Sequence, residues 1–381
     1  MSRIALVAGF AARIVSLVTL SSTHCLAASP SNDPARYAWE TLAQNSSPVS
    51  VTDHRAKWER WRSSGYLFGK PEIKHNCAPD DEGKELVQSV EFTILSGLRA
   101  PPAEGFELRF NSFVCQSVLG QGLFSVTGRM KAFKVGKDIV FPDGSIALKG
   151  KWIKGNCDAK RFHCGVDKSG SPLRLIALHL AIKHPLTPSW FWATWEHESV
   201  IQTPGYAEVG MCCNDGFGFR SQVPTPALKD LLRQNGLGGE WQHYRLVGTQ
   251  TEFEEHGAPT YLGNTEIEAG FARASSCITC HARATTDSFG APMDIFRCDL
   301  KCAPTGTGGA SDKCQPTSCL PSYRGSDKCN PNACLTSYNG RIEPSWYLDS
   351  DKRVKYIKTG FIWSLSDGSL SVLYPLRKPA K

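Results

Sequence analysis

The sequence predicts an α+β fold that is rich in strands and forms a single domain. Hydrophobic residues make up 41% of the 381 residues, which is enough for a sizeable core, and charged residues make up only 21%. Short strand-like runs bounded by turn residues occupy 87–148 and return at 173–197. No clean linker divides the chain, and its length suits one large domain.

In the first half, two helices are expected before a series of strands. In chain order, we expect helices at 33–45 and 52–63 and strands at 87–95 and 145–149. Thr52 or Asp53 can cap the second helix, because a short polar side chain accepts from an amide of the first turn. The turn Pro142-Asp143-Gly144 should precede the strand at 145–149.

In the second half, one helix and a terminal hairpin are expected. Thr225-Pro226 should start a helix that runs through Leu232, since Pro suits the first helical position, and Gly236 should end it. The end of the chain should form a hairpin over 361–373, with its turn at Asp367-Gly368.

Residues 1–27 are typical of a secretory signal peptide. Arg3 and Arg13 precede an apolar run at 14–20, and small residues at 25–28 supply a cleavage site. The alternative is a membrane anchor, but Arg13 interrupts the apolar stretch, and spanning takes about 18–20 apolar residues. We therefore expect a periplasmic or otherwise exported protein whose mature domain is 28–381.

The charge of the chain is mildly basic, which excludes some partners. Cleavage removes two Arg and no acidic residue, so the net charge falls from +7 to +5. Without a basic stripe, this charge does not favour nucleic acid. No later segment is apolar enough to cross a membrane, so no integral membrane segment is expected after cleavage.

The strongest motif in the sequence is Cys277-Ile278-Thr279-Cys280-His281. Two thiols at this spacing on a helical turn can form thioethers with the two vinyl groups of haem, and the following His can ligate the iron. A chance match, a zinc site or a redox pair are the alternatives. Zinc would need a second ligand pair, and a thioredoxin-like site would need a βαβ pattern, which the sequence lacks here. The motif predicts one covalent haem c, with His281 as proximal ligand.

The remaining cysteines predict disulfides, because exported thiols oxidise. Of 15 Cys, twelve remain after Cys25 and the motif pair are set aside, which allows up to six bridges. A 15-residue repeat at 311–338 places four of them in a segment, 303–340, dominated by Gly, Pro, Ser and Thr. We expect a disulfide-stapled loop inserted after the haem motif. A metal-binding or partner-docking loop is the alternative.

Two apolar runs, Leu173–His184 and Trp190–His197, are expected to pair as central strands. If His184 faces Trp190 in this hairpin, His179, Trp195 and His197 fall on one face, because side chains alternate along a strand. Such a cluster could line a haem and supply a distal ligand or a proton donor. Each could equally be a structural residue of the core, and a register shift of one would destroy the cluster.

The sixth ligand of the iron is left open by the sequence. Met293 lies twelve residues after His281, in a Pro-containing loop that could reach the opposite face of a haem. His179 and His197 are the imidazole candidates, with His179 weighed against Met293, and an empty sixth site is the remaining possibility.

Several segments together resemble bacterial exported mono-haem proteins of the cytochrome c family. The most specific part runs from Trp241-Gln242-His243-Tyr244-Arg245 through Gly263-Asn264-Thr265 to the haem motif and Ala282-Arg283-Ala284. Shorter matches lie at 38–42, 141–152, 177–179, 191–197 and 361–364. The resemblance implies haem and export. It implies no settled activity and no distal ligand.

Three functions follow from this interpretation. The first is electron transfer through a six-coordinate haem, with a redox partner protein or a small-molecule oxidant or reductant. The second is a haem enzyme, peroxidase-like, or a small-molecule sensor with an open or displaceable sixth site, in which His179, Trp195 and His197 would act. The third is a binding protein with a structural haem.

Overall fold

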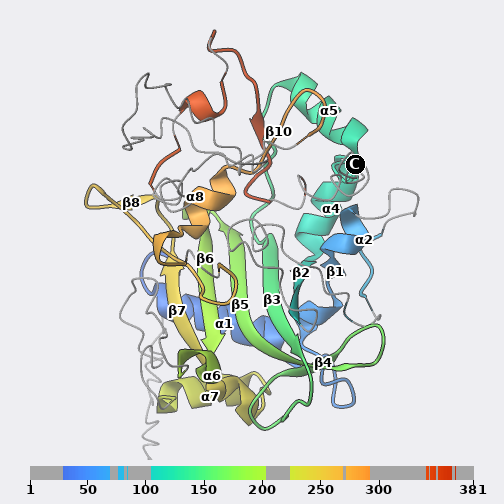
Figure 1. The fold of residues 1–381 in the computed structure, drawn as a ribbon, viewed down its shortest axis with the longest axis vertical. Coiled ribbons are helices and arrows are strands. Elements are labelled where there is room, and N and C mark those ends of the chain that lie inside the picture. Colours follow the sequence, from blue (N-terminus) through green and yellow to red (C-terminus); the bar gives the residue numbers. More distant parts are fainter. Residues whose placement is uncertain are drawn as a thin grey trace, which may run out of the picture.

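The centre of the protein is an antiparallel sheet of seven strands (Figure 1). The computed structural model describes residues 29–68, 76–80, 84, 104–202, 224–268, 272–291, 340–342, 344–348, 351–362 and 365. The strands of this sheet are β1 (Arg62–Ser63), β2 (Glu104–Phe110), β3 (Ile146–Lys154), β4 (Cys164–Val166), β5 (Pro172–His184), β6 (Thr187–His197) and β7 (Tyr244–Gln250). Their order is β1-β2-β3-β5-β6-β7, with β4 also paired to β5. The expected mixture of helices and strands is confirmed.

The two longest strands, β5 and β6, lie in the interior of the sheet, as their apolar sequences predict. The predicted register between them is wrong by one residue: Trp195 pairs with Leu178, and His179 pairs with Thr194. The reason lies at the turn. His184 pairs with Thr187 across a two-residue connection, and Trp190 has a φ of 66° at the irregularity that follows.

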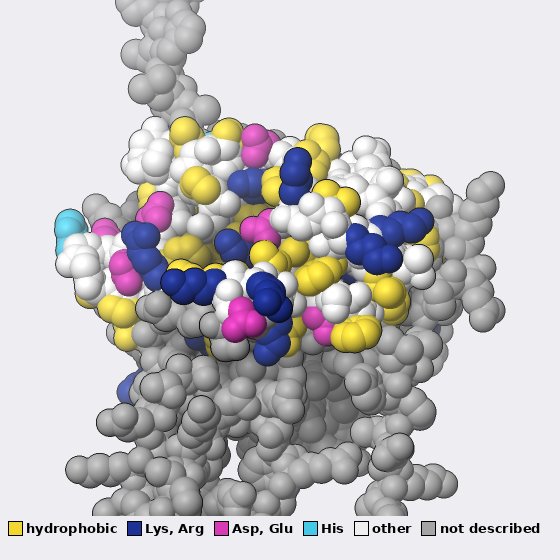
Figure 2. Space-filling model, turned by 90° about the horizontal axis from the view of Figure 1, so that it is seen from above, with side chains coloured by type: hydrophobic (Ala, Val, Ile, Leu, Met, Phe, Trp, Pro, Cys, Tyr) yellow, Lys and Arg dark blue, Asp and Glu magenta, His cyan; other side chains and the backbone are white. Residues whose placement is uncertain are grey.

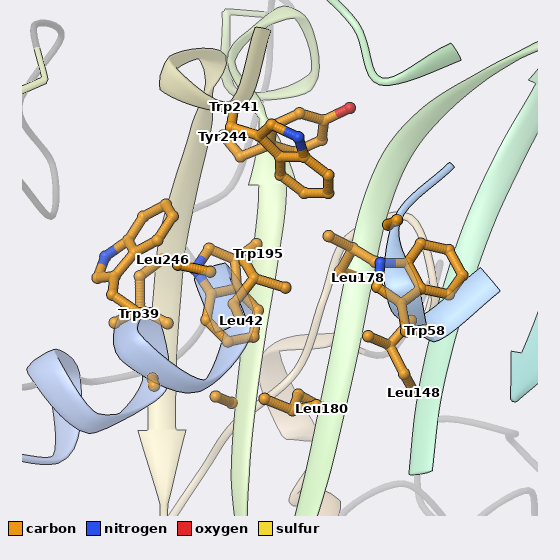
Figure 3. Close-up of a cluster of buried hydrophobic side chains, with 14 of the residues drawn as sticks. Trp39, Leu42, Trp58, Leu148, Leu178, Leu180, Trp195, Trp241, Tyr244 and Leu246 are labelled. Carbon is orange, nitrogen blue, oxygen red and sulfur yellow. The ribbon is translucent and has the colours of Figure 1, made fainter. Parts of the chain in front are cut away.

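One face of the sheet is covered by α1 (Pro34–Ser46) and α7 (Pro226–Gln234), which bury the Trp-rich core of Figure 3. Both helices confirm the sequence prediction. The Asp33 side chain caps α1 by accepting from the Arg36 amide, and Thr225 caps α7 by accepting from the Leu228 amide. Gly236, with a φ of 68°, follows the end of α7.

The opposite face carries a second hydrophobic cluster, over which α8 (Cys277–Ala282) lies (Figure 1). Trp190 and Trp192 of β6 belong to this cluster, together with Ile278 of α8. The same cluster includes side chains of α2 (Ser64–Phe68), α4 (Ser112–Gly120) and, at its edge, α5 (Val126–Val135). The motif at Cys277–His281 is therefore packed against β6 of the sheet.

The predicted helix at 52–63 is wrong, because only Lys57–Arg60 forms a single 3-10 turn. Glu59 is buried there and accepts hydrogen bonds from Lys84 and His163. It also accepts from the Ala56 amide at 2.9 Å. These long-range partners hold the segment as a short turn, which leads into β1.

The remaining elements are short. They are α6 (Glu198–Ile201), β8 (Glu254–Glu255), β9 (Ala258–Pro259), β10 (Thr285–Thr286), β11 (Ile357–Lys358) and 3-10 turns at Gly239–His243, Ala272–Ala274 and Pro344–Trp346. The expected turn at Pro142-Asp143-Gly144 does precede β3, and Gly144 has a φ of 83°.

Two disulfides join described residues, Cys77–Cys115 and Cys157–Cys164, which supports the expectation of an oxidising compartment. The expected strand at 87–95, the expected signal peptide and the cysteine repeat at 311–338 lie outside the described residues. Of the expected strand at the start of the terminal hairpin, Phe361, Ile362 and Leu365 are described, and none of them is in a strand. Among the described helices, none has the length and apolar character to cross a membrane.

Candidate functional site

The motif at Cys277–His281 begins at a helix cap that is tied to the sheet. Ser276 caps α8 through its hydroxyl, which accepts from the Thr279 amide at 3.3 Å. The side-chain amide of Gln250, at the end of β7, donates to the Ser276 hydroxyl at 2.8 Å and accepts from the Ile278 amide at 3.0 Å. Because Gln250 is buried and both its polar atoms are used, the start of the motif has one fixed position.

His281 is held as a neutral imidazole. Its Nδ1 donates to the backbone oxygen of Phe361 at 2.8 Å, which fixes the tautomer and leaves a lone pair on Nε2. Burial lowers the pKa of His281 to about 4, and the nearby Lys149 and His179 act in the same direction. In the described part of the chain, no group hydrogen bonds to Nε2. This is the form in which His ligates a metal.

The ring of His281 packs on Trp192 of β6, with ring centroids 4.4 Å apart and an angle of 44° between the planes. Trp192 is itself fixed, because its Nε1 donates to the Ser189 oxygen at 3.0 Å. The orientation of His281 is thus set by a hydrogen bond on one edge and a buried aromatic ring on one face.

Cys277 and Cys280 lie one helical turn apart and both are thiols. The Sγ atom of Cys277 donates to the Leu262 oxygen at 3.2 Å, and burial raises the pKa of this thiol well above its ordinary value. Neither is in a disulfide. The motif therefore has the two thiols and the adjacent imidazole that covalent haem attachment requires.

The loop at 262–268 holds α8 against the sheet, and sequence reasoning did not identify its key residue, Asn264. The Asn264 side chain donates to Thr194 Oγ1 at 2.8 Å and to the Trp195 oxygen at 3.1 Å. Its Oδ1 accepts from the amides of Glu266 and Ile267. The only signal in the sequence was that Asn264 falls within the segment that carries the family resemblance.

The same loop brings Glu268 to His179 of β5. Both carboxylate oxygens of Glu268 lie 3.0 Å from His179 Nε2. Glu268 also accepts a hydrogen bond from the backbone amide of Asn264 at 2.8 Å. Burial alone would raise the pKa of Glu268, but the charge and hydrogen bond of His179 lower it. His179 and Glu268 both influence the pKa of His281, so the pair lies within electrostatic reach of the motif. Glu268 was not identified from the sequence.

The structure does not bring Trp195 and His197 to this site. Trp195 packs with Trp39 in the core on the opposite face of the sheet. His197 stacks on Phe162, its Nε2 donates to the Arg161 oxygen at 3.0 Å, and its Nδ1 accepts from the Ser199 amide at 3.1 Å. The predicted cluster with His179 is therefore wrong, because the one-residue shift in register places His179 on the other face. Met293 lies outside the described residues.

Figure 2 shows the end of the molecule at which α8 and α5 lie in Figure 1. Hydrophobic side chains lie across this face, with Lys and Arg side chains and several Asp and Glu side chains among them. Exposed lysines of this end include Lys134 on α5, Lys358 of β11 and Lys355 just before it.

Within the described ranges, no group of three or more His, Cys, Asp or Glu side chains is arranged to hold a metal ion. A haem iron needs no such group, since the porphyrin supplies four of its ligands. Comparisons of the chain with protein-family models, with curated proteins and with solved structures found no match.

Proposed function

We propose that this protein is an exported c-type cytochrome that carries one covalent haem and transfers electrons. The observation that carries the proposal is the state of His281, a neutral imidazole whose Nδ1 is held by the Phe361 oxygen and whose Nε2 keeps its lone pair. Cys277 and Cys280, as thiols on the same helix, would hold the haem, and its iron would supply the redox chemistry.

Electron transfer is favoured by the surroundings of the motif. The buried Trp192 and the hydrophobic cluster around it provide the apolar environment that tunes a haem potential. The basic side chains around this end suit an acidic redox partner protein, which they would attract over long range at low salt.

A haem enzyme or sensor is the second candidate, and the pair of His179 and Glu268 is the observation that favours it. A His held by a carboxylate near an open iron site can move protons during peroxide reduction. Because Nε2 of His179 is already engaged by Glu268, the geometry favours His179 as a proton donor over His179 as an iron ligand.

Optical spectra of the exported protein, ferric and ferrous, with and without carbon monoxide, test the proposal. Electron transfer predicts a low-spin spectrum that carbon monoxide does not change, and a high-spin or carbon-monoxide-binding haem would transfer the assignment to the enzyme or sensor. His281→Ala should abolish the native spectrum. His256→Ala, at a side chain that is 94% exposed, is the matched control and should leave the spectrum unchanged. A wild-type protein without haem would refute the proposal.

A further inference from the structure

Arg129 of α5 is a buried cation to which no described residue supplies a counter-charge. Its residue is 1% exposed. Nε donates to the Gly290 oxygen at 2.9 Å and Nη1 donates to the Leu123 oxygen at 3.0 Å. Nη2 is buried and has no hydrogen-bond partner, and no carboxylate of the described residues forms an ion pair with Arg129.

A second buried Arg side chain, that of Arg109, shows what is missing. Arg109 is 2% exposed, and it has Glu107 at 2.7 Å and Asp80 at 2.6 Å. An isolated buried charge is unfavourable by several kcal/mol, so buried guanidinium groups are normally paired. Burial lowers the pKa of Arg129 to about 10, which still leaves the group charged at neutral pH. An anion bound to the Arg129 guanidinium would therefore stabilise this buried charge.

The position of Arg129 relates it to the haem motif. Helix α5 packs against β10, which begins three residues after α8 ends. Thr286 of β10 is fully buried, and its hydroxyl has no hydrogen-bond partner. Gly290, which accepts from Arg129, belongs to the segment that continues from β10. A cation and a hydroxyl, both buried with unused donors, thus lie on two elements that pack together, and one of these elements, β10, closely follows the motif in the chain.

We propose that Arg129 and Thr286 bind an oxyanion, and that in the haem-loaded protein this oxyanion is a haem propionate. The inference rests on the proposed function for the source of the carboxylate. The chemistry is that of a guanidinium fork, which donates to the oxygens of a carboxylate or a phosphate, with a hydroxyl as a third donor. A free phosphate would share this chemistry, so the experiment has to distinguish the two sources.

The test uses the exported, haem-loaded protein and the variants Arg129→Gln, Arg129→Lys and Lys131→Gln. Lys131 is an exposed cation on the same helix and serves as the matched control. Resonance Raman spectroscopy reports the propionate bending mode, and redox titration reports the midpoint potential. Arg129→Gln should shift the propionate mode and make the midpoint potential more negative, because a cation near the haem favours the reduced state. Arg129→Lys should restore part of both shifts, and Lys131→Gln should cause neither.

Two results would overturn the assignment to a propionate. One is a propionate mode and potential in Arg129→Gln that equal those of the wild type. The other is a thermal midpoint of the haem-loaded protein that rises with added phosphate and loses this response in Arg129→Gln, since a propionate would already fill the site. If the wild-type chain carries no haem, the proposed function fails, and the oxyanion site is tested on that chain. A phosphate response that depends on Arg129 supports the site there, and no response overturns it.

Discussion

Asn264 joins the loop at 262–268 to the sheet, and replacing it measures how firmly the candidate site is held. The side-chain amide of Asn264 makes four hydrogen bonds, and the residue is fully buried. At about 1 kcal/mol for each, Asn264→Ala should lower the free energy of unfolding by about 4 kcal/mol. The freed loop should also loosen Glu268 and α8, so under the proposed function the haem content of the exported protein should fall.

Urea unfolding followed by circular dichroism measures the free energy, and absorbance per protein measures the haem content. Asn235→Ala is the matched control, because the side-chain nitrogen of Asn235 donates one hydrogen bond, to the Leu231 oxygen at 2.9 Å. This control should lose about 1 kcal/mol and keep its haem. If Asn264→Ala loses no more than the control and keeps a full complement of haem, the described loop does not hold the site.

Three further predictions concern the scaffold, each measured by urea unfolding. Glu59→Gln removes the buried carboxylate that accepts hydrogen bonds from Lys84 and His163, and it should cost about 3–5 kcal/mol. Glu40→Gln, in a partly exposed helical pair, should cost under about 1 kcal/mol. Equal losses would contradict the network around Glu59. Replacing both Cys77 and Cys115 by Ala should cost about 4 kcal/mol, since the bridge closes a separation of 38 residues, and a loss below about 1 kcal/mol would contradict this. Burial lowers the pKa of His197 to about 4, so the unfolded chain takes up a proton there below pH 6.5 while the folded protein does not. That group should therefore remove about 3 kcal/mol of stability as the pH falls from 6.5 to 4. His197→Gln should flatten the pH dependence in this window, and an unchanged slope would show that His197 does not cause it.

Local signals predicted the elements that depend on local chemistry. The caps of α1 and α7 and the turn before β3 follow from residues within a few positions of each element. The apolar character of β5 and β6 correctly placed them inside the sheet, because strands covered on both faces need apolar side chains on both.

Features that depend on distant partners could not be predicted. The segment at 52–63 has helical spacing, yet the buried partners of Glu59, 25 and 104 residues away, override it. The register of β5 and β6 depends on a turn of two residues and on an irregularity at Trp190, and neither has a distinctive sequence.

The candidate site divides in the same way. The chemistry proposed for the site was predicted from the sequence, because the spacing of Cys277, Cys280 and His281 is itself the pattern that indicates haem attachment. The groups that position these residues could not be predicted from the sequence. The carbonyl that orients His281 lies 80 residues further along the chain, and the carboxylate beside His179 lies 89 residues away. Backbone groups and single acidic residues at such separations leave no pattern in one sequence.

The most direct test of the central claim is the intact mass of the exported protein, followed by the mass of the proteolytic peptide that contains Cys277 and Cys280. We predict that the protein gains the mass of one haem, that the gain resides on this peptide, and that replacing both cysteines by Ala removes it. A mature chain that is exported in a strain competent for haem attachment and still has the unmodified mass, or has these two cysteines in a disulfide, would contradict the account.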